Sequence, residues 1–248
     1  MSWRPSRLAD MVGQTQLRER LEALVLAAVM KNDALPHMLL YGPRGTGKTT
    51  LARALAAERG VAIVEATGDS VQSKDDVVRL VDMLSIEGYL FNPANDAWEQ
   101  TGERISPTIV FIDEIHRMSK EATEALYHPL EERVISLVKS GRIVTGVLPR
   151  FTLLGATTDA GKLLTPLTAR MRMMYVEPYT DDELFTIACA HDAHREVQPG
   201  VPRVGFSREA LWVVASRSQG NPRLLVNNLT ELADIAMVQG CCEVTSAK

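Results

Sequence analysis

The sequence contains few cysteines, no long apolar run and no excess of basic residues. Three cysteines in 248 residues are too few and too poorly spaced for a disulfide framework, so we expect a reducing cytoplasmic location. No run of 18 apolar residues is present to cross a membrane, and the first residues lack the pattern of a secretion signal. A net charge of −4 argues against a globally basic nucleic-acid-binding surface, although a local basic face stays open.

Residues 42–49 match the phosphate-binding pattern G-x-x-x-x-G-K-[ST]. Glycines let backbone N–H groups surround an anion, and the helix that follows offers its positive N-terminal end. A short apolar strand, 37–41, precedes the loop, and a strong helix former, 51–57, follows it. A glycine-rich surface turn is the alternative. We predict that ATP binds here through Gly42, Gly45, Thr46, Gly47, Lys48, Thr49 and Thr50.

Two of these side chains have specific expected roles. Lys48 reaches the β- and γ-phosphates, and the Thr49 hydroxyl binds Mg²⁺.

Asp113 and Glu114 follow the apolar run 108–112 directly. Carboxylates at the carboxyl end of a buried parallel strand lie where ligands bind in open α/β sheets. We therefore assign Asp113 to the metal and Glu114 to activation of the attacking water.

The pattern of strands and helices predicts a parallel-sheet α/β domain with a P-loop NTPase fold, residues 1–178. Expected strands lie at 37–41, 61–64, 108–112, 151–155 and 173–176, with helices at 14–30 and 119–130 and from 73 onward. Residues 134–138 and 143–147 are predicted to form a β-hairpin. From about residue 179, helix caps at Thr180, Ser207 and Asn221 predict a small all-helical second domain, 179–248.

Residues 88–107 break the pattern, and we expect a long loop or a small excursion. Its aromatic residues either fold back on the core or form a partner-binding patch.

Several motifs resemble the AAA+ ATPases of the RuvB type, the bacterial motors of Holliday-junction branch migration. They are D-E-I-H-R at 113–117, F-T-L-L-G-A-T-T at 151–158, L-L-T-P-L at 163–167 and G-N-P-R at 220–223. Residues 12–14 are similar to the family's entry segment, which lies against the adenine. The resemblance covers essentially the whole chain and implies an AAA+ domain followed by a lid. Family members also carry a C-terminal winged-helix domain, which these 248 residues do not include, whether by truncation or by nature.

The resemblance also implies roles for three further residues. Thr158 matches sensor 1, with Thr157 as the alternative. Arg170 matches the arginine finger, which acts on the nucleotide of a neighbouring subunit, and Arg172 is its competitor. Arg223 matches sensor 2 at the start of a lid helix. For each arginine, a solvated surface charge is the alternative.

The implied function is that of an ATP-hydrolysing DNA-processing motor of the RuvB type, using ATP and Mg²⁺. Because the finger acts in trans, the resemblance implies a homo-oligomer, a hexameric ring or spiral. One alternative is a clamp-loader- or helicase-loader-like switch that remodels a protein partner on DNA. Another is a scaffold that binds ATP to oligomerise and barely hydrolyses it, although Glu114 and Arg170 argue against this.

Contacts with partners are less well defined by the sequence. DNA is expected to meet pore-facing loops without sequence specificity, through Lys74, Lys139, Arg142 or Arg150; ordinary surface charges are the alternative. The hairpin at 134–149, where family members meet their junction-recognising partner, and the segment 88–107 are the candidate protein-binding regions. The hairpin looks shorter and 88–107 longer than in the family, which argues against recruitment of the same partner. His191 and His194 lack a third metal ligand, and we expect both on the surface.

Overall fold

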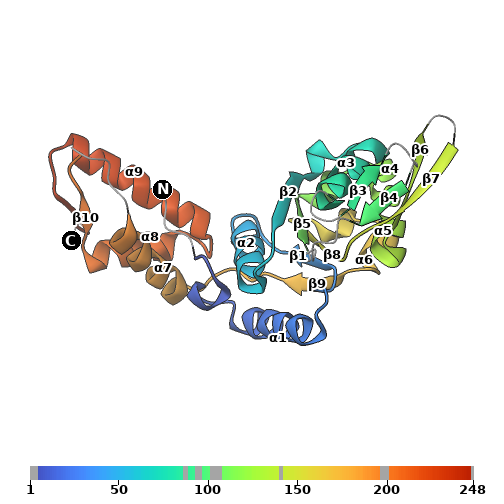
Figure 1. Ribbon diagram of the computed structural model, residues 1–248. Coiled ribbons are helices and arrows are strands. Elements are labelled where there is room, and N and C mark those ends of the chain that lie inside the picture. Colours follow the sequence, from blue (N-terminus) through green and yellow to red (C-terminus); the bar gives the residue numbers. More distant parts are fainter. Residues whose placement is uncertain are drawn as a thin grey trace. The chain divides into compact units, whose positions relative to one another are not determined.

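The computed structural model describes residues 5–85, 89–92, 97–100, 108–139, 142–195 and 201–246. The chain divides into two compact units, whose elements are labelled in Figure 1. The sheet unit comprises residues 19–41 and 55–175, and the lid unit comprises residues 1–18, 42–54 and 176–248. Helices α1 (Thr15–Lys31) and α2 (Lys48–Arg59) contribute residues to both units.

A five-stranded parallel sheet with the order β2–β5–β8–β1–β9 forms the centre of the sheet unit. Its strands are β1 (Met38–Tyr41), β2 (Ile63–Thr67), β5 (Thr108–Asp113), β8 (Phe151–Thr157) and β9 (Arg172–Tyr175). All of β8 and all but the last residue of β5 are buried. Strands covered on both faces need unbroken apolar sequences. The predicted parallel α/β fold is confirmed.

Parallel strands give the sheet two chemically different edges. At the carboxyl edge, Tyr41 pairs with Thr157 across β1 and β8, and Thr67 pairs with Asp113 across β2 and β5. The strands begin at the opposite edge, which we call the amino edge; Phe151 starts β8 there.

Three helices of the sheet unit pack their apolar side chains into one core with the strands. They are α3 (Lys74–Ser85), α4 (Lys120–Ala125) and α5 (Tyr127–Glu132). Ser73 and Asp76 form a reciprocal cap before α3, with N–H to side-chain oxygen distances of 3.0 and 3.2 Å. Buried members of this core include Val77, Leu80, Val81, Val110, Ile112, Ala122, Leu130 and Leu153.

The structure refines two predictions for the sheet unit. The expected helical segment 119–130 consists of two helices, because the chain leaves the α4 pattern at Leu126 before α5 begins. The segment 88–107, expected as a long loop or a small excursion, contains the paired strands β3 (Tyr89–Asn92) and β4 (Ala97–Gln100), which fit a small excursion. The role of its aromatic side chains lies outside the described part of the chain.

The predicted hairpin is confirmed as β6 (Val134–Lys139) and β7 (Arg142–Val147), paired from Val134–Val147 to Lys139–Arg142. It projects from the rest of the sheet unit in Figure 1. Val147, near its base, is 65% exposed.

The lid unit contains three helices, α7 (Asp181–His194), α8 (Arg208–Arg217) and α9 (Pro222–Val238). Thr180, Ser207 and Asn221 cap them as predicted, each accepting a hydrogen bond from a backbone N–H of the first turn. A short parallel pair, β10 (Gly205–Phe206) and β11 (Glu243–Val244), adds to the helices. The apolar core includes Leu184, Ala188, Leu211, Val214, Leu225 and Leu229.

Short turns connect these elements: η1 (Leu8–Asp10), η2 (Gly68–Ser70), η3 (Ile115–Arg117), η4 (Ala160–Lys162) and α6 (Thr165–Thr168). Among the described helices, none has the length and apolar character needed to traverse a bilayer.

Candidate nucleotide-binding and hydrolysis site

The predicted phosphate loop connects the end of β1 to the start of α2. Lys48 is the first residue of α2 and is 7% exposed. Its Nζ donates to the carbonyl oxygens of Gly42 (2.9 Å) and Pro43 (2.8 Å), and Thr46 Oγ1 donates to the Pro43 carbonyl (2.9 Å). The loop therefore curls around a cationic group placed at a helix N-terminus, an arrangement suited to phosphate.

Within the lid unit, the start of α9 holds this loop. Asn221 Nδ2 donates to the Arg44 carbonyl at 3.1 Å. Gly45 has φ +83°, and a Cβ on it would lie 2.2 Å from Asn221 Oδ1. Only glycine combines this backbone conformation with so close an approach. Arg223, the predicted sensor 2, is exposed two residues after Asn221, so the structure brings its segment to the phosphate loop.

The entry segment is fixed to the linker that precedes α7. Gln14 Nε2 donates to the Glu177 carbonyl (2.7 Å), and the Glu177 N–H donates to Gln14 Oε1 (3.1 Å). Tyr179 is buried beside it; burial, with a smaller contribution from the nearby Glu183 carboxylate, raises the pKa of Tyr179 to about 12. Tyr179 is 7% exposed and belongs to the apolar core of the lid unit.

The two predicted catalytic carboxylates lie at the carboxyl edge of the sheet. Asp113 ends β5, and its Oδ1 accepts the Glu114 N–H at 3.0 Å. Glu114 adopts the left-handed conformation, φ 49° and ψ 47°. Non-glycine residues in this region are uncommon and cluster at functional sites. Gly68 accommodates the turn, since a Cβ there would lie 2.2 Å from the Glu114 carbonyl oxygen.

Glu114 Oε2 is the centre of a polar network. It accepts from Thr158 Oγ1 at 3.1 Å and lies 3.3 Å from His116 Nδ1. Thr157 is fully buried, and its hydroxyl lies 2.8 Å from the same His116 nitrogen. The structure thus brings Thr158, which is exposed, to Glu114 and directs Thr157 into the protein. Sequence reasoning did not identify His116 within this network.

Arg170, the predicted finger, lies near the amino edge and is 22% exposed. Its guanidinium forms an ion pair with Glu131 (2.8 Å), lies 4.8 Å from the Tyr127 ring centroid and donates to the Pro166 carbonyl (2.6 Å). Arg170 Nε is buried and has no acceptor within the described chain. The competitor, Arg172, is exposed at the start of β9. Sequence reasoning missed the Glu131 and Tyr127 contacts.

The register of the sheet separates Arg170 from Glu114. Arg172 is level with Phe111 when the paired residues are followed from β9 through β1 and β8 to β5. Glu114 is three residues beyond Phe111, about 10 Å along the strand, and three strand spacings add about 14 Å across the sheet. Arg170 precedes Arg172 in the chain and pairs with Glu131, so its guanidinium lies away from the Glu114 carboxylate of the same chain.

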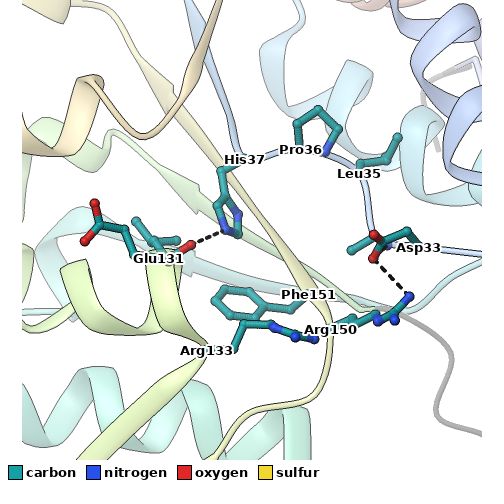
Figure 2. A pocket seen from close by; sticks show the side chains of 10 residues that line it. Asp33, Leu35, Pro36, His37, Glu131, Arg133, Arg150 and Phe151 are labelled. Atoms are coloured by element: carbon teal, nitrogen blue, oxygen red, sulfur yellow. Dashed lines mark hydrogen bonds and ion pairs between the residues drawn. The ribbon is translucent and has the colours of Figure 1, made fainter. Parts of the chain in front are cut away.

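A cavity of about 380 Å³ opens at the amino edge between the start of β1 and the end of α5 (Figure 2). Arg150 lies 3.3 Å from Asp33 across one side, and it also donates to the Asn32 carbonyl at 2.9 Å. Glu131 lines the cavity and is the residue that binds Arg170. The expected DNA contact of Arg150 thus competes with internal contacts, and the lining of this cavity does not include the two predicted catalytic carboxylates.

His37 is a partly buried side chain beside this cavity. Its Nδ1 accepts the Leu153 N–H at 2.9 Å, so the neutral ring carries its proton on Nε2, which faces the Leu130 carbonyl at 3.2 Å. Burial lowers the pKa of His37, partly offset by the Leu130 carbonyl. The ring joins α5 to β8 and is not available as a ligand.

The remaining basic and histidine predictions have mixed outcomes. Lys74 is exposed, and the side chains of Lys139 and Arg142 lie outside the described part of the chain. The expectation that both lid histidines lie on the surface is wrong for His191, which is 3% exposed, because α7 turns it into the lid core. Burial lowers the pKa of His191.

The family model described as "ATPase family associated with various cellular activities (AAA)" matches residues 38–179. This range contains the phosphate loop, both carboxylates and both threonines, and the chain belongs to this family of ATPases. Within the family it is RuvB-like. It is 34% identical over 251 residues to the Holliday junction branch migration complex subunit RuvB of Limosilactobacillus reuteri, covering 98% of this chain and 66% of the relative.

Solved structures agree with this relationship. The Thermotoga maritima RuvB Holliday junction branch migration motor superposes with a TM-score of 0.76 at 28% identity, covering 97% of this chain and 68% of that one. A variant of the same protein gives 0.79 at 29% identity, covering 98% and 70%. The chain thus spans about two thirds of the length of the relatives that it matches.

Proposed function

We propose that this chain is an ATP-hydrolysing DNA-processing motor of the RuvB type, in which each active site is completed by a neighbouring copy. The observation that carries the proposal is that Arg170 and Glu114 lie at opposite edges of the sheet and three strand spacings apart. Both residue types are needed to stabilise and hydrolyse a transferred phosphoryl group. Their placement in one chain supports an assembly in which the arginine serves another subunit.

The residues fit ATP with Mg²⁺. The glycine-rich loop offers backbone N–H groups, Lys48 offers an ammonium and Thr49 a hydroxyl, while Asp113 offers the hard oxygen ligand that Mg²⁺ prefers. Asn221 orders the loop from the lid side, which supports the assignment of Arg223 as a sensor of the γ-phosphate. Gly42, Gly45, Thr46, Gly47 and Thr50 complete the proposed cradle.

Glu114 is the proposed general base. Thr158 donates to one of its carboxylate oxygens, and this contact orients the carboxylate toward a water. Bound Mg²⁺ would neutralise charge on the phosphates while Glu114 accepts the proton of the attacking water. Thr158 is the proposed sensor 1, because it is exposed and touches Glu114 directly.

Arg170 is the proposed trans finger. Glu131 is half exposed, and an ion pair of this kind contributes little stability. A triphosphate with several negative charges can therefore displace Glu131 from the guanidinium when two copies associate. A ring or spiral of about six copies fits this arrangement, by analogy with the RuvB relatives.

The proposed substrate is branched DNA, on the analogy of the relatives named as branch-migration proteins. Contacts would be with phosphates and would carry no sequence information. The β6–β7 hairpin, with exposed Val147 near its base, and the segment 88–107 are the proposed protein-binding regions. The proposed compartment is the cytoplasm, where DNA and ATP are both present.

Turnover of ATP measured alone, with branched DNA and with linear duplex tests the proposal. A DNA-processing motor shows continuous turnover that rises with branched DNA alone. Turnover that appears only when a clamp or helicase is added would favour a loader-like switch.

Lys48→Ala should abolish ATP binding in calorimetry, and retention of wild-type affinity would contradict the phosphate-loop assignment. Electron microscopy with an ATP analogue, with and without branched DNA, should show rings or spirals.

A further inference from the structure

His116 connects the ends of two strands at the carboxyl edge. It lies in η3, directly after β5, and its side chain is 11% exposed. Its Nδ1 lies 2.8 Å from Thr157 Oγ1 at the end of β8 and 3.3 Å from Glu114 Oε2. A single ring nitrogen therefore faces both the proposed general base and the strand that carries the proposed sensor.

The hydrogen-bond pattern selects one form of this ring. Thr157 Oγ1 accepts the Asp159 N–H at 3.0 Å and has a second lone pair for another donor. With the proton on Nδ1, the imidazole donates toward both Thr157 and Glu114. With the proton on Nε2, the Nδ1 lone pair would face the Glu114 carboxylate at 3.3 Å, a repulsive contact in a largely buried place.

The geometry points to His116 as a positioning residue that holds the Glu114 carboxylate through Nδ1–H. This role rests on the proposed ATPase function. Glu114 Oε2 receives Thr158 from one side and His116 from another. Within the described chain, Oε1 makes no hydrogen bond to the protein, so the two contacts fix the carboxylate and leave Oε1 for water.

Losing His116 should slow the chemical step without weakening nucleotide binding. Its contacts are to Glu114 and Thr157, and neither residue belongs to the phosphate loop. A displacement of about 1 Å in a reacting group lowers rates by about 100-fold. We expect single-turnover ATP hydrolysis to fall roughly 10- to 100-fold in His116→Ala, with the ATP dissociation constant changed by less than about twofold.

Two conservative variants separate the nitrogens. In His116→Asn the amide N–H₂ can occupy the Nδ1 position, whereas in His116→Gln it reaches the Nε2 position. We expect His116→Asn to stay within about threefold of the wild-type rate and His116→Gln to match His116→Ala. Asparagine and glutamine are similarly polar, so the comparison stands even if the alanine variant unfolds. His128→Ala, at a side chain 78% exposed on α5, is the matched control and should leave the rate unchanged.

Two results would overturn the inference: a wild-type rate in His116→Gln, or equal losses in the asparagine and glutamine variants. A second measurement needs no turnover. Long-range ¹H–¹⁵N correlation spectra of the full chain at pH 8 should show His116 as the Nδ1–H tautomer, and an Nε2–H tautomer would overturn the inference. If the tautomer is as expected but wild-type protein hydrolyses no ATP, then the proposed function fails while the geometry of His116 stands.

Discussion

The carboxyl and amino edges of the sheet are built for different tasks. At the carboxyl edge, Glu114 sits in a left-handed turn, and a threonine and a histidine converge on one of its oxygens. At the amino edge, His37 ties α5 to β8, and Arg170 rests on Glu131. Strand direction alone sorts these groups, because every parallel strand delivers its last residue to the same edge.

The two edges differ in whether one chain alone brings together the groups that the proposed reaction needs. The groups proposed to activate water are assembled within one chain, through contacts between the ends of β5 and β8. The guanidinium proposed to complete the reaction is held by the same subunit at the far edge, about 17 Å or more from Glu114 by strand spacing. An active site that needs both edges needs two copies of the chain.

Arg170→Ala should have the largest effect. Removing a trans arginine lowers phosphoryl-transfer rates by about 10³–10⁵, while ATP binding, measured by calorimetry, should be retained. Arg172→Ala is the control at the same edge, because Arg172 follows Arg170 closely in the sequence but is exposed at the start of β9. A larger loss in Arg172→Ala would transfer the finger role to Arg172.

Glu114→Gln should lower hydrolysis by about 10²–10⁴, the usual contribution of a general base. The amide oxygen can still accept from Thr158, so the fold and ATP binding should persist. Steady-state phosphate release with calorimetry measures both. Unchanged turnover would contradict the general-base role of Glu114 at the carboxyl edge and favour a scaffold that binds ATP in order to oligomerise.

Gly68→Ala should destabilise the carboxyl edge by about 1–3 kcal/mol, because its Cβ would meet the Glu114 carbonyl oxygen at 2.2 Å. Denaturant midpoints measure the loss, and hydrolysis should fall with it as Glu114 shifts. Gly205→Ala is the control, since an added Cβ there meets nothing within 4 Å. Equal stability of the two variants would show that the η2 turn accommodates the added Cβ without loss of stability.

The smallest predicted effect concerns the amino edge and pH. Burial lowers the pKa of His37 in the folded state, so the unfolded chain takes up the proton more readily. The free energy of unfolding should therefore fall as pH drops below the ordinary histidine value of about 6.5. His37→Gln should flatten the dependence of Tm on pH between 7.5 and 5.5, with His191 contributing to the slope that remains. Between pH 7.5 and 9 the slopes should coincide, and an unchanged acidic slope would contradict a neutral, partly buried His37.

Local sequence patterns were sufficient for the features that depend on neighbours along the chain. The strands at β1, β5 and β8, the phosphate loop and the caps at Thr180, Ser207 and Asn221 all follow from runs of a few residues. The strand expected at 61–64 is β2 (Ile63–Thr67), since element ends depend on pairing, here with β5.

Features set by long-range packing could not be predicted in this way. The break at Leu126 within the expected helix 119–130 and the burial of His191 depend on which surfaces meet. Tyr127 and Glu131 share a helix face by spacing, but their contact with Arg170 joins segments about forty residues apart, for which no local signal exists. His116 was visible within the D-E-I-H-R motif, yet its contact with Thr157 becomes apparent only when β5 and β8 pair.

Mixing Arg170→Ala subunits with Glu114→Gln subunits tests the central claim most directly. Each variant alone should be nearly inactive. In a mixed assembly, the Glu114 of an Arg170→Ala subunit can meet the Arg170 of a Glu114→Gln neighbour, so some sites regain both groups. We predict that ATP turnover recovers on mixing, in proportion to such pairings. A mixture as inactive as its components would contradict the claim that one copy completes the site of the next.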